Sequence, residues 1–242
     1  MKFATPLIRA TLNKRYKRFL ADVTCDDGTE LTVHCANPGS MMGLTEAGSD
    51  VWLSDSNNPK RKLRYSWELI AVGDALVGIN TAHPNRIVED AVAAGQVPEL
   101  RGYGTLRREV KYGKNSRIDL LLQDDDKGDC YVEVKNVTLM RQAGLAEFPD
   151  AKTARGTKHL EELALMAEAG HRAVMFYLVQ RTDCSSCTVA ADIDPAYAAA
   201  LADAQARGVE TLCYDCTISP EAIRLNAALP FHIAPETGLR TG

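Results

Sequence analysis

The chain has 242 residues, of which 45% are apolar and 25% charged, and its net charge is −4. This is an ordinary globular composition, and the net charge by itself does not indicate a nucleic-acid-binding protein. No apolar run approaches the ~18 residues needed to span a bilayer, and the N-terminus lacks the apolar core of a signal peptide, so we expect a cytoplasmic protein with no membrane partner.

Two basic clusters nevertheless lie within the first 80 residues. They consist of Lys14, Arg15, Lys17 and Arg18, and of Lys60, Arg61, Lys62 and Arg64. A local basic patch can bind phosphate even on a mildly acidic protein, although a solvated surface is the alternative for either cluster alone. Tyr16 and Phe19 interleave with the first cluster, as aromatic residues do on nucleic-acid surfaces; the alternative places one of these rings in the core.

The first third of the chain is predicted to consist of short strands separated by turn residues. The expected strands cover residues 7–12, 18–24, 31–35, 50–54, 66–72 and 75–80. Strands of this length and spacing indicate a small barrel or sandwich, and an OB-type barrel fits the size. The loop of small residues around Asn37 exposes backbone amides that could bind an anion; a simple tight turn is the alternative.

Beyond a boundary near residues 80–84, helices and strands alternate. We expect helices over residues 84–94, 151–170, 195–207 and 220–229, strands over 105–112, 172–181 and 209–214, a hairpin over 116–137, and an irregular loop over 142–150. The strand–helix–strand order near the end predicts a parallel crossover. An antiparallel meander extended by such a crossover is typical of the restriction-endonuclease-like fold.

The hairpin carries an acid pair and a lysine. Glu133 and Lys135 alternate with valines and should share one face. A turn centred near Lys127 would pair Asp119 with Lys135 and bring all three side chains together. Two carboxylates suit a hard divalent cation, Mg²⁺ or Mn²⁺, and the lysine could orient water beside a phosphodiester. The alternative is a structural ion pair, since the motif is short.

Three cationic or ionisable residues, Arg155, Lys158 and His159, fall in the first turns of the helix expected over residues 151–170. Cations are unfavourable at this end of a helix, and a phosphate site would account for them; the alternative is ordinary surface. Glu89, in the helix expected over residues 84–94, could lean toward the sheet as a further metal ligand.

Seven cysteines in a cytoplasmic protein favour free thiols over disulfides. Cys184 and Cys187 form one CxxC pair and Cys213 and Cys216 another, which raises a structural zinc site. The last two, however, fall in an expected strand, where residues three apart face opposite ways.

The chain resembles the sugar fermentation stimulation protein A family over about residues 2–233. The matching motifs are R-Y-K-R-F-L-A-D-V (15–23), H-C-A-N-P-G-S-M (34–41), K-R-K (60–62), S-W-E-L (66–69), N-R (85–86), E-V-K-Y-G (109–113), S-R-I-D (116–119), Y-V-E-V-K-N-V-T-L (131–139), F-P-D-A (148–151) and R-G-T-K-H-L-E-E-L (155–163).

The resemblance implies an α+β protein with an OB-like barrel over residues 1–82, a restriction-endonuclease-like domain of the PD-(D/E)xK type over 83–233, and a disordered tail over 234–242. It places the nuclease motif on Asp119, Glu133 and Lys135, carries Glu89 only by general position, and argues against zinc at the four cysteines. Family members are regarded as DNA-binding without strong sequence preference and as regulators of maltose metabolism.

Two functions follow as expectations. The first is a non-cleaving DNA-binding protein that uses Arg15, Tyr16, Lys17, Arg18, Asn37, Lys60, Arg61, Lys62, Arg155, Lys158 and His159. The alternative is an active Mg²⁺-dependent nuclease acting through Asp119, Glu133 and Lys135. Sugar binding on Trp52 or Trp67 has weaker support than packing of these rings in the core. The sequence leaves a homodimer open.

Overall fold

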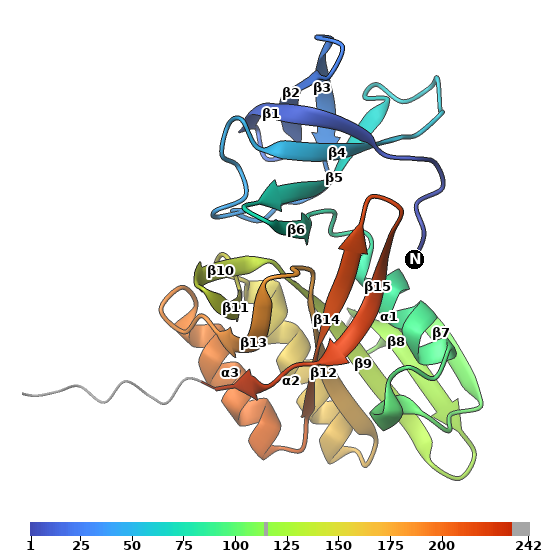
Figure 1. The fold of residues 1–242 in the computed structure, drawn as a ribbon. Helices are drawn as coiled ribbons and strands as arrows, with labels where there is room; N and C mark the ends of the chain where they lie inside the picture. Colours follow the sequence, from blue (N-terminus) through green and yellow to red (C-terminus); the bar gives the residue numbers. More distant parts are fainter. Residues whose placement is uncertain (114–115, 234–242) are drawn as a thin grey trace, which may run out of the picture.

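The computed structural model describes residues 1–113 and 116–233. Figure 1 shows a barrel of strands placed above a second domain in which helices flank a sheet. The tail expected to be disordered, residues 234–242, lies outside the described residues. Within those residues, no helix has both the length and the apolar character needed to cross a bilayer.

The first domain is a closed barrel of five strands. They are β1 (Ile8–Tyr16), β2 (Leu20–Cys25), β3 (Glu30–Cys35), β4 (Asp50–Asp55) and β5 (Tyr65–Val72). The strand order is β3-β2-β1-β4-β5, and a parallel pairing of His34 with Ser66 and of Cys35 with Trp67 closes the barrel. Alternate residues such as Leu12, Val33 and Trp67 fill its interior. The expected OB-type barrel is confirmed, and β6 (Ala75–Gly78) leads from it into the second domain.

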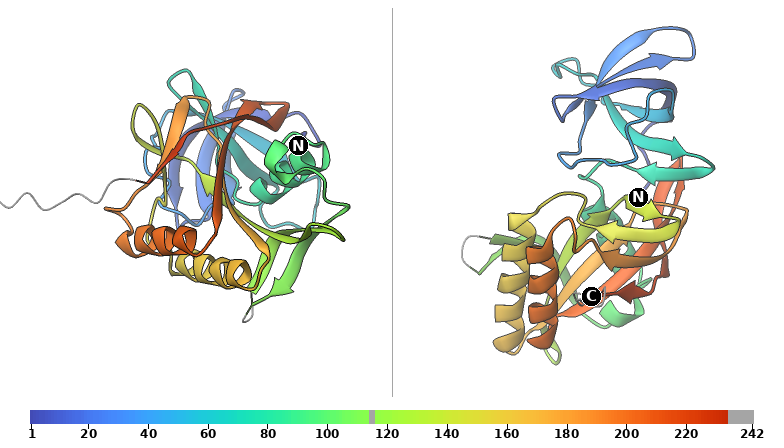
Figure 2. Two further views of the ribbon diagram at one scale, coloured as in Figure 1. Left: turned by 90° about the horizontal axis from the view of Figure 1, so that it is seen from below. Right: turned by 90° about the vertical axis from the view of Figure 1, so that its left-hand side faces the viewer.

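The second domain is built on a six-stranded mixed sheet. Its strand order is β15 (Ala222–Ala228), β14 (Glu210–Ser219), β12 (Arg172–Val179), β9 (Gly128–Val137), β8 (Ser116–Asp124) and β7 (Thr105–Tyr112). One face packs on α1 (Pro84–Ala93) and the 3-10 turn η1 (Pro98–Leu100). The other packs on α2 (Ala154–Glu168) and α3 (Pro195–Ala206), which lie side by side (Figure 2). The pairing of β12 with β14 is parallel, as the predicted crossover requires, and the pairing of β12 with β9 is parallel as well.

Two parts of this domain differ from the sequence prediction. The irregular loop expected over residues 142–150 instead contains β11 (Gly144–Phe148). This strand forms a second sheet with β10 (Leu139–Gln142), β13 (Cys184–Val189) and β16 (Phe231–His232). The helix predicted over residues 220–229 is wrong. The chain turns back after Ser219 and Ala222–Ala228 pairs antiparallel with β14, because β14 offers it a free edge.

Helix α2 begins three residues later than predicted. The side chain of Thr153 accepts a hydrogen bond from Gly156 N at 3.0 Å and so caps the first turn. Thr153 N in turn donates to the carboxylate of Asp194, the residue that caps α3, at 2.7 Å. The starts of the two helices are therefore fixed to each other, and with them the residues that α2 presents to the sheet.

Candidate nucleic-acid and metal site

The β8–β9 hairpin forms as predicted, but its strand register differs from the predicted one. Leu120 pairs with Val132 and Asp124 with Gly128, so the turn is centred on Asp126. The predicted pairing of Asp119 with Lys135 is therefore wrong, and the observed register brings Asp119 level with Glu133. The error arises because the polar turn contains several residues that could serve as its centre.

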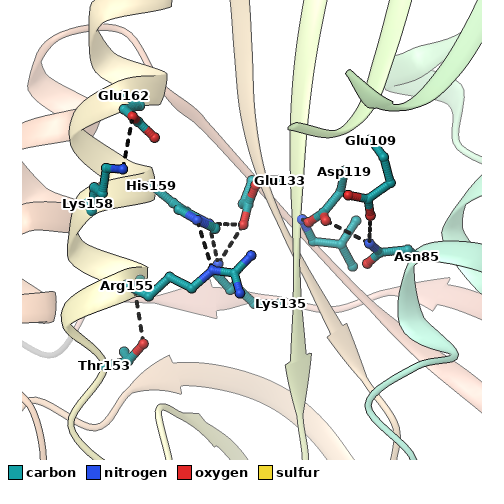
Figure 3. Close-up of polar contacts among 12 residues, drawn as sticks. Asn85, Glu109, Asp119, Glu133, Lys135, Thr153, Arg155, Lys158, His159 and Glu162 are labelled. Atoms are coloured by element: carbon teal, nitrogen blue, oxygen red, sulfur yellow. Dashed lines mark hydrogen bonds and ion pairs between the residues drawn. The ribbon is translucent and has the colours of Figure 1, made fainter. Parts of the chain in front are cut away.

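Glu133 is the centre of a buried polar network formed with α2. Its side chain is 3% exposed; Oε1 accepts hydrogen bonds from Lys135 Nζ, at 2.8 Å, and from His159 Nδ1. Figure 3 shows these side chains converging from β9 and from α2. Burial alone would raise the pKa of Glu133, but the hydrogen bond from His159 and the charge of Lys135 outweigh it and hold this pKa below its usual value.

Arg155 extends this network to the surface. Its Nε donates to His159 Nε2 at 3.2 Å. On the other side of the ring, Nδ1 contacts Glu133 Oε1 and lies 3.3 Å from Lys135 Nζ. An exposed cation that could contact phosphate is thus linked through one imidazole to a buried carboxylate. We call Glu133, Lys135, His159 and Arg155 the Glu133 network.

Asp119 belongs to a neighbouring group on the side of α1. Its Oδ2 accepts a hydrogen bond from Val134 N at 2.7 Å and its Oδ1 one from Asn85 of α1 at 2.6 Å. Asn85 also lies 3.5 Å from Glu109. The expected single cluster is therefore two adjacent groups (Figure 3), with the backbone of β9 between them.

A break in strand alternation explains this placement. Ile118 packs in the core beside α2, whereas Leu120 packs in the core beside α1, so residues two apart face opposite ways. The residue that would pair with Asp119 on β7 is Glu109, which has a left-handed φ of 51° and lies between the pairs Arg108–Leu120 and Val110–Ile118. The distortion turns Asp119 toward α1.

Burial and the negative charge of Glu133 raise the pKa of Asp119 to about 6, against the opposing effects of Val134 N–H, Lys135 and Asn85. Glu133 Oε2 is buried and has no hydrogen-bond partner. Asp119 thus resists ionisation, and the nearby Glu133 has a free carboxylate oxygen. Two such carboxylates are oxygen ligands of the kind that a hard divalent cation prefers. Among residues 1–113 and 116–233, however, no three His, Cys, Asp or Glu side chains are already grouped to hold a metal.

Two further buried polar residues were missed by the sequence prediction. Glu162 of α2 is 4% exposed, and neither carboxylate oxygen has a hydrogen-bond partner, although Lys158 Nζ lies 3.6 Å from Oε1. The hydroxyl of Tyr112 is likewise buried and unpartnered, and burial together with the charges of Glu133 and Glu162 raises its pKa. The sequence signal was an acid placed between two apolar residues, Leu160 and Leu163, of the same helix.

Several predicted DNA-binding residues instead have structural partners in the barrel. Arg15 donates to the carbonyls of Asn37, at 2.8 Å, and Gly39, at 3.0 Å. Asn37 is 4% exposed; its amide donates to Ile79 O and accepts from Gly39 N. Tyr16 donates its hydroxyl to Asp22 at 3.0 Å. Arg15 and Asn37 therefore shape the loop over residues 37–41, and their polar atoms are already engaged.

The loop over residues 37–41 does bind an anion, and that anion is a side chain of the second domain. Met41 N donates to Asp150 Oδ2 at 3.0 Å, and Ser40 Oγ donates to the same oxygen at 3.2 Å. A Cβ on Gly39 would lie 2.5 Å from this oxygen, so the approach requires glycine. Beside the contact lies a pocket of about 210 Å³ that is lined by residues of both domains, among them Asn37 of the barrel and Asn136 of the second domain.

The two basic clusters lie at opposite ends of β1. Lys17 and Arg18 follow its last residue, whereas the loop carrying Lys60, Arg61 and Lys62 leaves β4 beside the first residues of β1, since Ile8 pairs with Leu53. Figures 1 and 2 show that loop projecting away from the second domain. Arg61 also donates to Ser66 at 3.1 Å. Only the cluster at the β1–β2 turn lies on the side of α2.

The remaining expectations concern acids, thiols and tryptophans outside this site. Glu89 forms an ion pair with Arg108 at 3.0 Å instead of joining Asp119. Cys184, Cys187 and Cys213 pack in the core beside α2 and α3, whereas Cys216 packs on the opposite face with α1, so the four thiols do not converge. Trp67 is fully buried in the barrel and Trp52 packs against the core beside α1.

Comparison with known proteins agrees with this architecture. Residues 14–79 match the family model described as "SfsA N-terminal OB domain", and residues 82–222 match "Sugar fermentation stimulation protein RE domain". A curated relative from Rhodospirillum centenum, named "Sugar fermentation stimulation protein homolog", is 63% identical over 95% of this chain and 98% of its own length. A relative of the same name from Roseobacter denitrificans is 57% identical over 96% of this chain and 100% of its own length.

Among solved structures, the SfsA protein of Pyrococcus furiosus in complex with Ca²⁺ superimposes with a TM-score of 0.86 at 25% identity, covering 96% of this chain and 98% of that chain.

Proposed function

This chain belongs to the sugar fermentation stimulation protein family, and we propose that it binds nucleic acid, DNA in the first instance, with little sequence preference. The observation that carries the proposal is the contact of Asp150 with the loop over residues 37–41. It fixes the barrel turn that bears Lys17 and Arg18 on the same side as the start of α2, which bears Arg155 and Lys158. A strand that follows these cations would pass the Glu133 network.

The weak sequence preference follows from how the helices pack. All three α-helices among the described residues bury one face against the main sheet, and none projects as a recognition helix for the major groove. The cations of the proposed surface are suited to phosphates, which carry no sequence information.

Fluorescence anisotropy with labelled oligonucleotides tests this proposal. We expect oligonucleotides of unrelated sequence to bind with similar affinity, and the logarithm of the binding constant to fall linearly with the logarithm of the salt concentration, at about 0.7–0.9 per phosphate contacted. An affinity that does not respond to salt, or a strong preference for one sequence, would contradict it.

A second candidate function is the hydrolysis of phosphodiesters. Two observations favour it: Glu133 Oε2 has no hydrogen-bond partner, and the pKa of the neighbouring Asp119 is raised. Asp119 and Glu133 would hold Mg²⁺ or Mn²⁺, and the Pyrococcus furiosus SfsA structure is a complex with Ca²⁺. When bound, such an ion supplies Lewis-acid activation of phosphate and water. Lys135, 2.8 Å from Glu133 Oε1, would orient the attacking water, and Arg155 and Lys158 would hold the phosphate.

This second function is tested by incubating plasmid and single-stranded DNA with Mg²⁺ or Mn²⁺. We expect cleavage by the unaltered protein and none by Glu133→Gln, which keeps the shape of the side chain but not its charge. Glu89→Gln is the matched control, because Glu89 is an acid of the same domain that is paired with Arg108. Cleavage that persists in Glu133→Gln would exclude these roles, and a thermal shift with Mn²⁺ reports ion binding independently of cleavage.

The name of the curated relatives refers to sugar fermentation. We propose that any influence of this chain on sugar metabolism, including that of maltose, acts through nucleic acid. Of the two rings considered for sugar stacking, Trp67 is fully buried in the barrel and Trp52 packs against the core beside α1.

A further inference from the structure

An exposed aromatic ring stands on the outer surface of the barrel beside the β1–β2 turn. Phe19 is 47% exposed, although a phenylalanine next to a strand is usually buried. Its ring lies 6.5 Å from that of His34 of β3, with an interplanar angle of 17°. The carbonyl of Phe19 accepts a hydrogen bond from Cys35 N at 2.9 Å, which fixes the residue against β3.

The strand register extends this pair into a continuous face. Tyr16 pairs with Leu20 across β1 and β2, and Leu20 pairs with His34 across β2 and β3. Directly paired residues share a face. The residues that follow Leu20 and precede His34, Ala21 and Val33, point into the barrel core. Tyr16, Phe19, Leu20 and His34 therefore form one surface, which we call the outer aromatic face.

Two cations border the outer aromatic face. Lys17 and Arg18 are exposed, and within the described part of the chain their side chains take part in no ion pair. Both have left-handed backbones, with φ of 49° and 61°. Such conformations are unfavourable for residues other than glycine, by about 1 kcal/mol each or more. Lys17 and Arg18 thus adopt unfavourable backbone conformations in the turn directly before the exposed ring of Phe19.

We propose that the outer aromatic face binds single-stranded nucleic acid by stacking an unpaired base on Phe19, with Lys17 and Arg18 on the adjoining phosphates. The proposal deepens the nucleic-acid binding proposed above and rests on it. A flat ring offers its face to any base, whereas the bases of a duplex are already stacked on one another and cannot reach it without unpairing. Phe19 therefore makes the barrel selective for single strands.

The test compares Phe19→Ala with Ile8→Ala by fluorescence anisotropy on labelled oligothymidylate and on a duplex of the same length. Ile8 is the matched control, because it is an exposed apolar residue, 36% exposed, at the other end of β1. Stacking of one base is worth a factor of roughly 5–150 in affinity. We expect Phe19→Ala to weaken single-strand binding about tenfold and to leave duplex binding unchanged, and Phe19→Trp to restore it with quenching of the new tryptophan.

An abasic strand separates stacking from charge, because it keeps the phosphates and lacks the bases. On such a strand, Phe19→Ala and the unaltered protein should bind equally, whereas Lys17→Ala should still weaken binding. Equal loss on single strand and duplex, or no loss on either, overturns the stacking proposal and leaves nucleic-acid binding standing. If Phe19→Ala instead separates a dimer in sedimentation and leaves binding unchanged, the face is a contact between two copies. Failure of the unaltered protein to bind any oligonucleotide overturns both proposals.

Discussion

The carboxylate of Asp150 accepts a hydrogen bond from the backbone N–H of Met41, 109 residues earlier in the chain, at 3.0 Å. Ser40 Oγ also donates to the backbone carbonyl of Asp150 at 2.8 Å. Because α2 begins four residues after Asp150, at Ala154, this contact fixes the barrel relative to the helix that carries Arg155 and His159.

Asp150→Ala should loosen this connection. Hydrogen bonds to a charged group contribute about 1.5–3 kcal/mol each, and we expect the free energy of unfolding measured with urea to fall by about 2 kcal/mol. Exchange of the Met41 amide proton should accelerate, because its acceptor is lost. Asp125→Ala, at an exposed position in the β8–β9 turn, is the control and should change neither quantity.

Gly39→Ala tests the same contact from the opposite side. The added Cβ would lie 2.5 Å from Asp150 Oδ2, and overpacking of this kind costs about 1–3 kcal/mol. In the Asp150→Ala background the obstructing oxygen is gone, so the same substitution should cost much less. A double-mutant cycle in urea that gives strictly additive effects would show that the two residues do not interact.

The raised pKa of Asp119 predicts how stability depends on pH. Its folded value is about 6 and its ordinary value is 3.8. Between these values the folded state retains a proton that the unfolded state releases, so this contribution to stability is complete below pH 3.8 and is lost as the pH rises through 6. Asp119→Asn removes the ionisation, and at pH 8 it should raise the free energy of unfolding by up to about 3 kcal/mol.

The same substitution should abolish stabilisation by divalent cations. If Asp119 holds the ion, Mn²⁺ should raise the melting temperature of the unaltered protein more at pH 8 than at pH 5, because the proton competes with the ion for the carboxylate. The Asp119→Asn protein should show no such shift at either pH. A shift that survives in this variant would place the ion elsewhere.

His159→Ala should expose how strongly the Glu133 network depends on its imidazole. Glu133 would remain buried with Lys135 as its remaining donor, and loss of a hydrogen bond to a buried charge costs about 1.5–3 kcal/mol. Leu165→Ala is the control on the same helix, because Leu165 is exposed. Unfolding in urea that is equally easy for both variants would mean that the network contributes little to stability.

The two basic clusters should contribute unequally to cleavage. Lys17→Ala with Arg18→Ala should weaken binding and reduce any cleavage, because these residues lie on the side of α2. Lys60→Ala with Lys62→Ala removes the same number of charges from the far end of β1 and should leave cleavage nearly unchanged at saturating DNA. Equal effects of the two double substitutions would contradict the proposed path of the strand.

Most of the architecture could be predicted from the sequence, because local residue patterns indicate both domains. Short strands with turn residues indicated the barrel, and the motif around Glu133 and Lys135 indicated the sheet on which the second domain is built. The final helix was mispredicted because Pro220 and the residues after it resemble a helix start, while the partner that makes them a strand is the free edge of β14.

The arrangement of the site was harder to predict from the sequence. Strand alternation placed Asp119 with Glu133, but Glu109, with its positive φ, interrupts the ladder at that level and turns Asp119 toward Asn85. The contact of Asp150 with Met41 joins residues more than 100 positions apart, and no periodicity within either segment encodes it. The sequence is compatible with Phe19 in the core or on a nucleic-acid surface, and the pairing of the three strands in the folded barrel places it beside His34.

A buried carboxylate, Glu68, lies at the junction between the two domains. This carboxylate lies in β5 and is 4% exposed, yet it accepts hydrogen bonds from Ser54, from Asn80 and, at 2.7 Å, from His83, the residue before α1. A protein severed after residue 82 would leave an interior negative charge in one fragment and its imidazole in the other. The two domains share this buried contact, so they should unfold together in a single thermal transition.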